Sequence, residues 1–200
     1  MTPTPYTDAD VAYVKTNFVS LEDLCRQHGG NDIAVREHIE RGQLPRPSYV
    51  LPDGREMVPD TYFALVDETG GIERLREEFL RRCHVAAAAE SVELDPEDEW
   101  VAYLTGEYGV CLHEVSPENI VRKAALMDRI EHLLEAPVQE SSGWTAALRD
   151  AVEGLDRLER PFAPDYDRLR FGSSSSRDRL ITATRERYPA VLESSAAAAD

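Results

Sequence analysis

The sequence predicts a mainly α fold, in which an N-terminal module of short helices and a β-hairpin is followed by a helical domain. Three observations predict it. Apolar residues recur at helical spacing in several long segments. Residues that commonly cap helices, above all Ser and Asp, stand directly before those segments. Two β-prone runs flank Pro52, Asp53 and Gly54, a combination typical of a hairpin. We place the module at residues 1–66, the helical domain at 67–190 and a disordered tail at 191–200.

In the N-terminal module, short helices are expected over residues 9–18, 20–28 and 33–41. Ser20 can cap the second helix, with Asp23 at the capping-box position. The sequence HGGND separates the second helix from the third, and Gly42 stands where a helix-ending glycine belongs. The run YVLPDGREMV then supplies both strands of the hairpin.

In the helical domain, helices are expected over residues 72–89, 96–106 and 117–136. Ser116 followed by Pro117 is a strong helix start. A further helix begins at Ser141 or Ser142 and ends before Pro161. The run YGVCL, residues 108–112, is expected to be a short apolar stretch, bent or extended.

Ser175 and Asp178 have the spacing of a capping box. They predict a last helix that runs to about Tyr188. The residues after Ser194 are expected to form a frayed alanine-rich end.

The composition excludes several classes of protein. The formal net charge is -16, and both parts of the chain are acidic, so a nucleic-acid duplex would repel them. No apolar run is long enough to span a membrane. The first residues lack the basic start and apolar stretch of a secretory signal, and Cys25, Cys83 and Cys111 are widely spaced. We therefore expect a cytoplasmic protein with reduced thiols and no membrane partner.

The order helix, glycine-containing turn, helix and hairpin, with the phrase IERGQLPRPSYVLPDGREMVP, resembles the winged helix-turn-helix of MerR-type regulators. The resemblance implies DNA-binding regulation as one alternative function. The expected reading helix carries Arg36 and Arg41 against Asp32, Glu37 and Glu40, whereas a reading helix normally presents more cations than anions to phosphates. We therefore favour packing or protein contact for this helix, and expect no nucleic-acid partner.

The candidate binding site is an arginine-rich segment near the C-terminus of this acidic chain. A Gly-Ser loop there leads into the predicted last helix, whose tip should present the free N–H groups of Arg177, Asp178 and Arg179. Arginine forks beside such N–H groups suit a carboxylate or phosphate. The expected anion-binding residues are Arg168, Arg170, Ser175, Ser176, Arg177 and Arg179. The alternative is that these arginines pair with neighbouring carboxylates and only fasten loops.

Aromatic residues could complete a pocket beside the anion site. Tyr and Trp give a cavity both apolar walls and polar tips. Trp100, Tyr103 and Tyr108 are the candidates, although aromatic residues at helical spacing are more often part of the core, as is expected of Trp144.

Other chemistry has weaker support. Three Cys/His neighbours occur, but a zinc site needs about four ligands that converge, so we expect no metal and no cofactor. Cys111 and His113 would point to opposite sides of a strand, which disfavours a nucleophile and its base. The acidic run at residues 93–99 is expected to be solvated. No catalytic residue is assigned, and the chain could be an enzyme or not.

Four segments together resemble a family of small actinobacterial proteins of unknown function, whose members are often labelled natural-product biosynthesis proteins. They are WVAYLTGEYGVCL, SPENIVRKAALMDRIEHLL, LDRLERPFAPDYDRLRFG and SSRDRLI. The resemblance implies a role in bacterial secondary metabolism. The leading expectation is therefore a protein that binds a small anionic or carrier-linked intermediate, as a biosynthetic enzyme or accessory factor. A protein-interaction scaffold that contacts a pathway enzyme is a further alternative.

Overall fold

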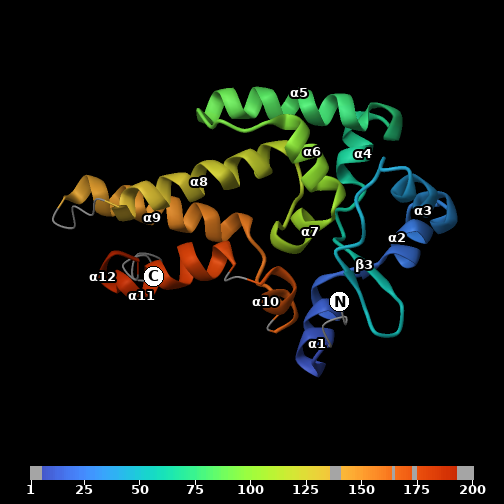
Figure 1. The fold of residues 1–200 in the computed structure, drawn as a ribbon, viewed down its shortest axis with the longest axis horizontal. Coiled ribbons are helices and arrows are strands. Elements are labelled where there is room, and N and C mark those ends of the chain that lie inside the picture. Colours follow the sequence, from blue (N-terminus) through green and yellow to red (C-terminus); the bar gives the residue numbers. More distant parts are fainter. Residues whose placement is uncertain (1–5, 136–140, 164, 173–174, 193–200) are drawn as a thin grey trace, which may run out of the picture.

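The computed structural model describes residues 6–135, 141–163, 165–172 and 175–192. As predicted, the protein is mainly helical, with a small sheet near its N-terminus (Figure 1). The helices that the sequence predicts begin and end within a few residues of their bounds in the structure.

The described part of the N-terminal module, from residue 6 onward, contains three helices and a three-stranded antiparallel sheet of order β1-β3-β2. Its elements are α1 (Asp8–Asn17), β1 (Val19–Ser20), α2 (Leu21–Gln27), α3 (Asp32–Glu40), β2 (Tyr49–Val50) and β3 (Glu56–Val58). The predicted hairpin pairs Tyr49 with Met57. Ser20 caps α2 by accepting the backbone N–H of Asp23, as expected, and the edge strand β1 was not predicted.

The helical body is built around three long helices that lie one above another (Figure 1). Helix α8 packs against α5 on one side and α9 on the other. The elements of the body are α4 (Ala64–Thr69), α5 (Ile72–Glu90), α6 (Pro96–Leu104), α7 (Glu107–Cys111), α8 (Pro117–Glu135) and α9 (Ser142–Leu158). Trp144, Leu148, Val152 and Leu155 recur on one face of α9 and are buried, which explains why this segment is a helix.

The C-terminal part is more broken than predicted. It contains α10 (Tyr166–Phe171), the π-helix η1 (Arg177–Thr182), α11 (Ala183–Arg187) and α12 (Pro189–Leu192). The tail expected over residues 191–200 overlaps the end of α12, and residues 193–200 lie outside the described part of the chain.

The expectation for residues 108–112 was wrong, because most of this run is the short helix α7. Gly106 precedes the helix with a φ of 80°, and this left-handed turn redirects the chain out of α6 into α7. A single helical turn contains too few residues to show a helical period, so the sequence pattern could not distinguish it from a strand.

One apolar cluster joins the N-terminal module to the C-terminal part. It contains Val14, Phe18, Tyr49 and Met57 from the module, together with Val110 and Ala163. Helix α10 is fastened to the same module by polar contacts, among them a hydrogen bond from the Arg170 guanidinium to the Ser48 carbonyl at 2.7 Å. The module therefore supports α10, which forms one wall of the site described next.

Candidate functional site

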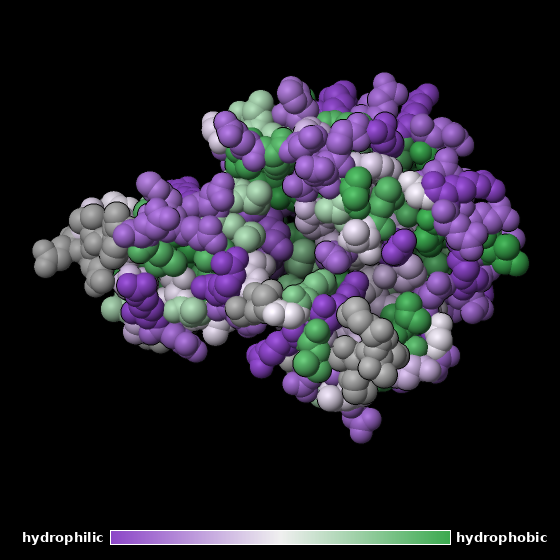
Figure 2. Space-filling model, in the orientation of Figure 1, coloured by the Kyte–Doolittle hydropathy of each residue, from purple (hydrophilic) through white to green (hydrophobic). Residues whose placement is uncertain are grey.

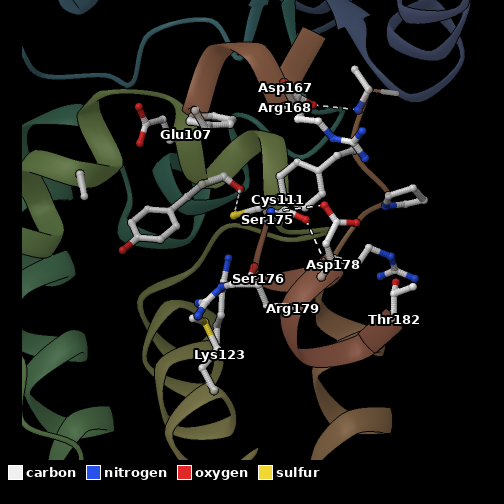
Figure 3. Close-up of a pocket in the computed structure, with 18 residues that line it drawn as sticks. Glu107, Cys111, Lys123, Asp167, Arg168, Ser175, Ser176, Asp178, Arg179 and Thr182 are labelled. Atoms are coloured by element: carbon white, nitrogen blue, oxygen red, sulfur yellow. Dashed lines mark hydrogen bonds between the residues drawn. The ribbon is translucent and has the colours of Figure 1, made fainter. Parts of the chain in front are cut away.

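A pocket of about 840 Å³ lies where α7, α8, α10 and η1 meet (Figure 3). Figure 2 shows the surface hollowed between the lobe of α8, α9 and α11 and the rest of the molecule. The polar lining residues are Glu107, Tyr108, Cys111, Lys123, Asp167, Arg168, Ser175, Ser176, Arg177, Asp178, Arg179 and Thr182. The apolar lining residues are Ala102, Met127, Pro161, Phe162, Ala163 and Phe171. The volume is in the range usual for small-molecule sites.

Arg168 is the pocket cation that is most available to a ligand. The residue is exposed, and its guanidinium makes no hydrogen bond or ion pair with any other described residue. Arg179 also lines the pocket and is about half exposed, at 3.5 Å from the Glu131 carboxylate. An unpaired guanidinium in a pocket wall can grip a carboxylate or phosphate through two parallel hydrogen bonds.

Arg177 and Ser176, in contrast, are held by the protein itself. The Arg177 guanidinium pairs with Asp156 and donates a hydrogen bond to the Glu159 carbonyl at 3.1 Å. The Ser176 hydroxyl donates to the Glu159 side chain. These contacts agree with the alternative expected from the sequence, in which some of the arginines fasten loops.

The tip of the last helix is partly closed. Ser175 and Asp178 form the predicted capping box, because the Asp178 N–H donates to Ser175 Oγ at 3.0 Å and the Ser175 N–H donates to Asp178 Oδ2 at 3.3 Å. The Arg179 N–H donates to the Ser175 carbonyl at 3.0 Å. The expectation that the N–H groups of Asp178 and Arg179 are free was therefore wrong. The helix also begins as a π-helix, a geometry often found at functional sites.

A buried charged network lies beneath the pocket. The Lys123 ammonium is 3.0 Å from the Glu159 carboxylate, which is fully buried. Burial acts to lower the pKa of Lys123, but the neighbouring Cys111 and Glu159 outweigh it and raise that pKa above its usual value. Burial raises the pKa of the Cys111 thiol, opposed by the Lys123 ammonium. Lys123 is therefore a charged residue that the protein neutralises, and Cys111 is kept as a thiol.

Asp167 is the buried acid of the pocket. Its side-chain Oδ2 accepts hydrogen bonds from the Tyr49 hydroxyl at 2.7 Å and from the Ala163 N–H at 2.8 Å. Burial raises the pKa of this carboxyl above its usual 3.8, and the hydrogen bonds from Tyr49 and Ala163 reduce the rise. Asp167 thus connects the pocket wall directly to strand β2 of the N-terminal module.

Several residues expected at the site lie elsewhere. Trp100 and Tyr103 are buried beside Phe79 in the core of the body and do not line the pocket. The Arg170 side chain contacts the N-terminal module instead, where its guanidinium donates a hydrogen bond to the Ser48 carbonyl. Of the three aromatic candidates, Tyr108 lines the pocket, with its hydroxyl bonded to Glu99.

The structure adds lining residues that sequence reasoning missed. Met127, Phe162 and Phe171 give the pocket apolar surface, and Lys123 and Asp167 give it buried charge. Lys123 had a detectable signal, since it is three residues after Ile120 and four before Met127, on the apolar face of α8, where a charged residue is unusual. Asp167 had none, because its partners Tyr49 and Ala163 are brought to it only by the fold.

Two alternative functions can be compared with the same structure. In α3, Arg36 pairs with Asp32 and Glu56, and Arg41 pairs with Glu37. Both arginines of the expected reading helix are thus already neutralised. For metals, the described residues contain no group of three or more His, Cys, Asp or Glu side chains that could hold an ion.

The fold and the site define a mainly helical protein with a ligand-sized pocket in its C-terminal half. The chain belongs to DUF6058, a family of unknown function, whose model matches residues 72–189. All lining residues of the pocket lie within this matched segment. No curated protein and no solved structure matches the chain. Among the described residues, no helix is both long and apolar enough to cross a membrane.

Proposed function

We propose that this protein binds a small anionic molecule, or the anionic end of a carrier-linked intermediate, in the pocket between α7, α8, α10 and η1. The observation that carries the proposal is Arg168, an exposed guanidinium in the pocket wall that has no partner among the described residues. A free arginine there is ready for a carboxylate or phosphate without first breaking an internal ion pair.

The apolar part of the wall supports a ligand with a hydrophobic body. Met127, Phe162 and Phe171 line the pocket together with the ring of Tyr108. Ligand pockets typically combine such apolar surface with a few polar groups that fix orientation. An organic acid with an aromatic or alkyl body fits this combination better than a bare inorganic ion.

The cellular context of this proposal is cytoplasmic bacterial secondary metabolism, in which the protein acts as a biosynthetic enzyme or an accessory factor. This context rests on the resemblance to proteins labelled for natural-product biosynthesis. DNA-binding regulation has less support, because the arginines of α3 are paired with carboxylates.

The experiment is a calorimetric titration with 3-phenylpropionate and with its neutral primary amide. The acid should bind at least about tenfold more tightly, the effect of one charge-assisted hydrogen bond. Arg168→Gln should remove this difference. Arg185→Gln is the matched control, because Arg185 pairs with Asp156 and does not line the pocket. Equal binding of acid and amide, or no binding of either, would refute the proposal. Octanoyl-coenzyme A tests the carrier-linked form in the same way.

A further inference from the structure

Arg179 is the second cation of the pocket wall whose side chain is open to a ligand. Its ion pair among the described residues is with Glu131, at 3.5 Å, and the two side chains are 49% and 46% exposed. Charge-assisted hydrogen bonds are normally shorter, at about 2.7–2.9 Å, and exposed ion pairs contribute little to stability. A ligand anion can therefore replace Glu131 at a small cost in free energy.

The other two cations of the pocket wall are not available in this way. Lys123 is 3.0 Å from the fully buried Glu159 carboxylate, and Arg177 is held by a carboxylate of α9. Arg168 and Arg179 are thus the exposed guanidinium groups of the described wall. Figure 3 shows that they belong to different elements, Arg168 to α10 and Arg179 to η1. A ligand between these elements can contact both.

The carboxylates of the described pocket wall do not neutralise these two arginines. They are Glu107, Asp167 and Asp178, and none of them forms an ion pair with either guanidinium. Asp167 is buried and bonded to the Tyr49 hydroxyl, and Asp178 accepts the Ser175 N–H in the capping box. The wall therefore carries two positive charges that its own anions leave unpaired, and such charges attract anions into a partly enclosed pocket.

We infer that the ligand is a dianion with two separate anionic groups, one bound by Arg168 and the other by Arg179. This inference rests on the proposed function and narrows its ligand class. A guanidinium that holds a carboxylate through two parallel hydrogen bonds occupies both of its oxygens, so the second guanidinium takes an anionic group of its own. A dicarboxylate with an apolar body suits both arginines and the walls formed by Met127, Phe162 and Phe171.

The test is a calorimetric titration of the intact protein with 3-phenylpropionate and with three acids that add a second carboxylate to it on a lengthening arm. These acids are 2-benzylsuccinate, 2-benzylglutarate and 2-benzyladipate, which cover several separations of the two anionic groups. The best of the three should bind at least about tenfold more tightly than 3-phenylpropionate, the effect of one further charge-assisted hydrogen bond. Its half-amides, in which either carboxylate becomes a neutral carboxamide, should lose that advantage.

Two substitutions assign the second anionic group to Arg179. Arg179→Gln should reduce the advantage of the dicarboxylate to less than about threefold and leave the binding of 3-phenylpropionate, which Arg168 holds, within about twofold. Glu131→Gln removes the competing carboxylate and should strengthen the binding of the dicarboxylate by about twofold to threefold. Both positions are half exposed, so neither change disturbs the core. Arg129→Gln is the matched control and should leave the advantage intact, because Arg129 is exposed on α8 and does not line the pocket.

The outcomes separate this inference from the proposed function. If 3-phenylpropionate binds through Arg168 but none of the dicarboxylates binds more tightly, the role of Arg179 is refuted while anion binding stands. The role is refuted too if Arg129→Gln removes the advantage as fully as Arg179→Gln does, or if Glu131→Gln weakens the binding of the dicarboxylate. If 2-phenylethyl phosphate, which carries its charges on a single group, gains what the dicarboxylates do not, one group contacts both arginines and the inference is overturned. If none of these acids binds, the proposed function itself fails.

Discussion

The carboxylate of Asp10 accepts a hydrogen bond from the backbone N–H of Asp165 at 2.9 Å, which joins helix α1 to the start of α10. A second N–H, that of Tyr166, donates to the same oxygen at 3.1 Å. The other oxygen closes the capping box of α1 with Thr7. One fully buried side chain therefore holds the first helix and the pocket wall together.

Asp10→Ala should destabilise the protein strongly. It leaves the N–H groups of Asp165 and Tyr166 without their acceptor, and hydrogen bonds to charged groups contribute about 1.5–3 kcal/mol each before relaxation. We expect a loss of about 3 kcal/mol in the free energy of unfolding, measured by urea denaturation. Thr7→Ala, which removes only the cap, should cost about 1 kcal/mol. Equal losses in the two variants would mean that the contact with α10 contributes nothing.

The same residue predicts a pH dependence. Burial acts to raise the pKa of Asp10, but the hydrogen bonds from Thr7, Asp165 and Tyr166 outweigh it and lower the pKa below its usual 3.8. A lowered pKa in the folded state means that the ionised carboxylate stabilises the fold at a pH above 3.8, and that this contribution is lost as the pH falls below 3.8. The stability gap between the wild type and Asp10→Asn, measured by urea denaturation from pH 7 to pH 3, should therefore narrow at the acid end. A gap that stays constant would contradict the prediction.

Gly106→Ala should also be costly. A Cβ atom there would lie 2.2 Å from the Arg46 carbonyl oxygen, and the φ of 80° is unfavourable for any side chain. Gly29→Ala is the matched control, because its φ is 67° but nothing lies within 4 Å of the added atom. We expect about 1 kcal/mol for the control and at least about 2 kcal/mol more for Gly106→Ala in denaturant unfolding. If both variants lose the same amount, the loop at Arg46 moves aside freely.

DNA should not bind to α3. The guanidinium of Arg36 is 2.7 Å from Glu56 and also pairs with Asp32, and the whole chain has a formal net charge of -16. Binding to a duplex would require these ion pairs to break, and the net negative charge of the chain would repel the DNA phosphates. A gel shift with promoter DNA from the same genomic region should show no retarded band even at low salt. A band that disappears in Arg36→Ala would reverse this conclusion.

Local signals in the sequence predicted much of the fold. Ser20, Asp95 and Ser141 each stand before an apolar helical pattern, and each caps its helix through its side chain. Such signals depend on residues only two or three positions apart, so they can be read without knowing the tertiary structure. The sequence did not predict helices α7 and α10, because each is a single short turn whose formation depends on packing.

The candidate site was predictable only in part. The arginine-rich segment does reach a pocket, and Arg168, Ser175 and Arg179 line it together. Arg177 is occupied by Asp156, on helix α9, and by the Glu159 carbonyl, directly after that helix. Because these partners are far from Arg177 in the sequence, the spacing of residues could not show which arginine stays free. Trp100 shows the same limit, since core and pocket aromatic residues share one helical pattern.

The π-helical start of the last helix has a consequence for the length of this segment. In η1 the Ala183 N–H donates to the Asp178 carbonyl, five residues back instead of four, so this turn contains one residue more than an α-helical turn would. A deletion inside an ordinary helix rotates everything beyond it out of phase with the core. Here the removal of one residue would convert the turn to α geometry and leave Thr184 and Tyr188 in phase with the core. The extra residue of this turn is therefore not needed to keep the helix beyond it in phase with the core.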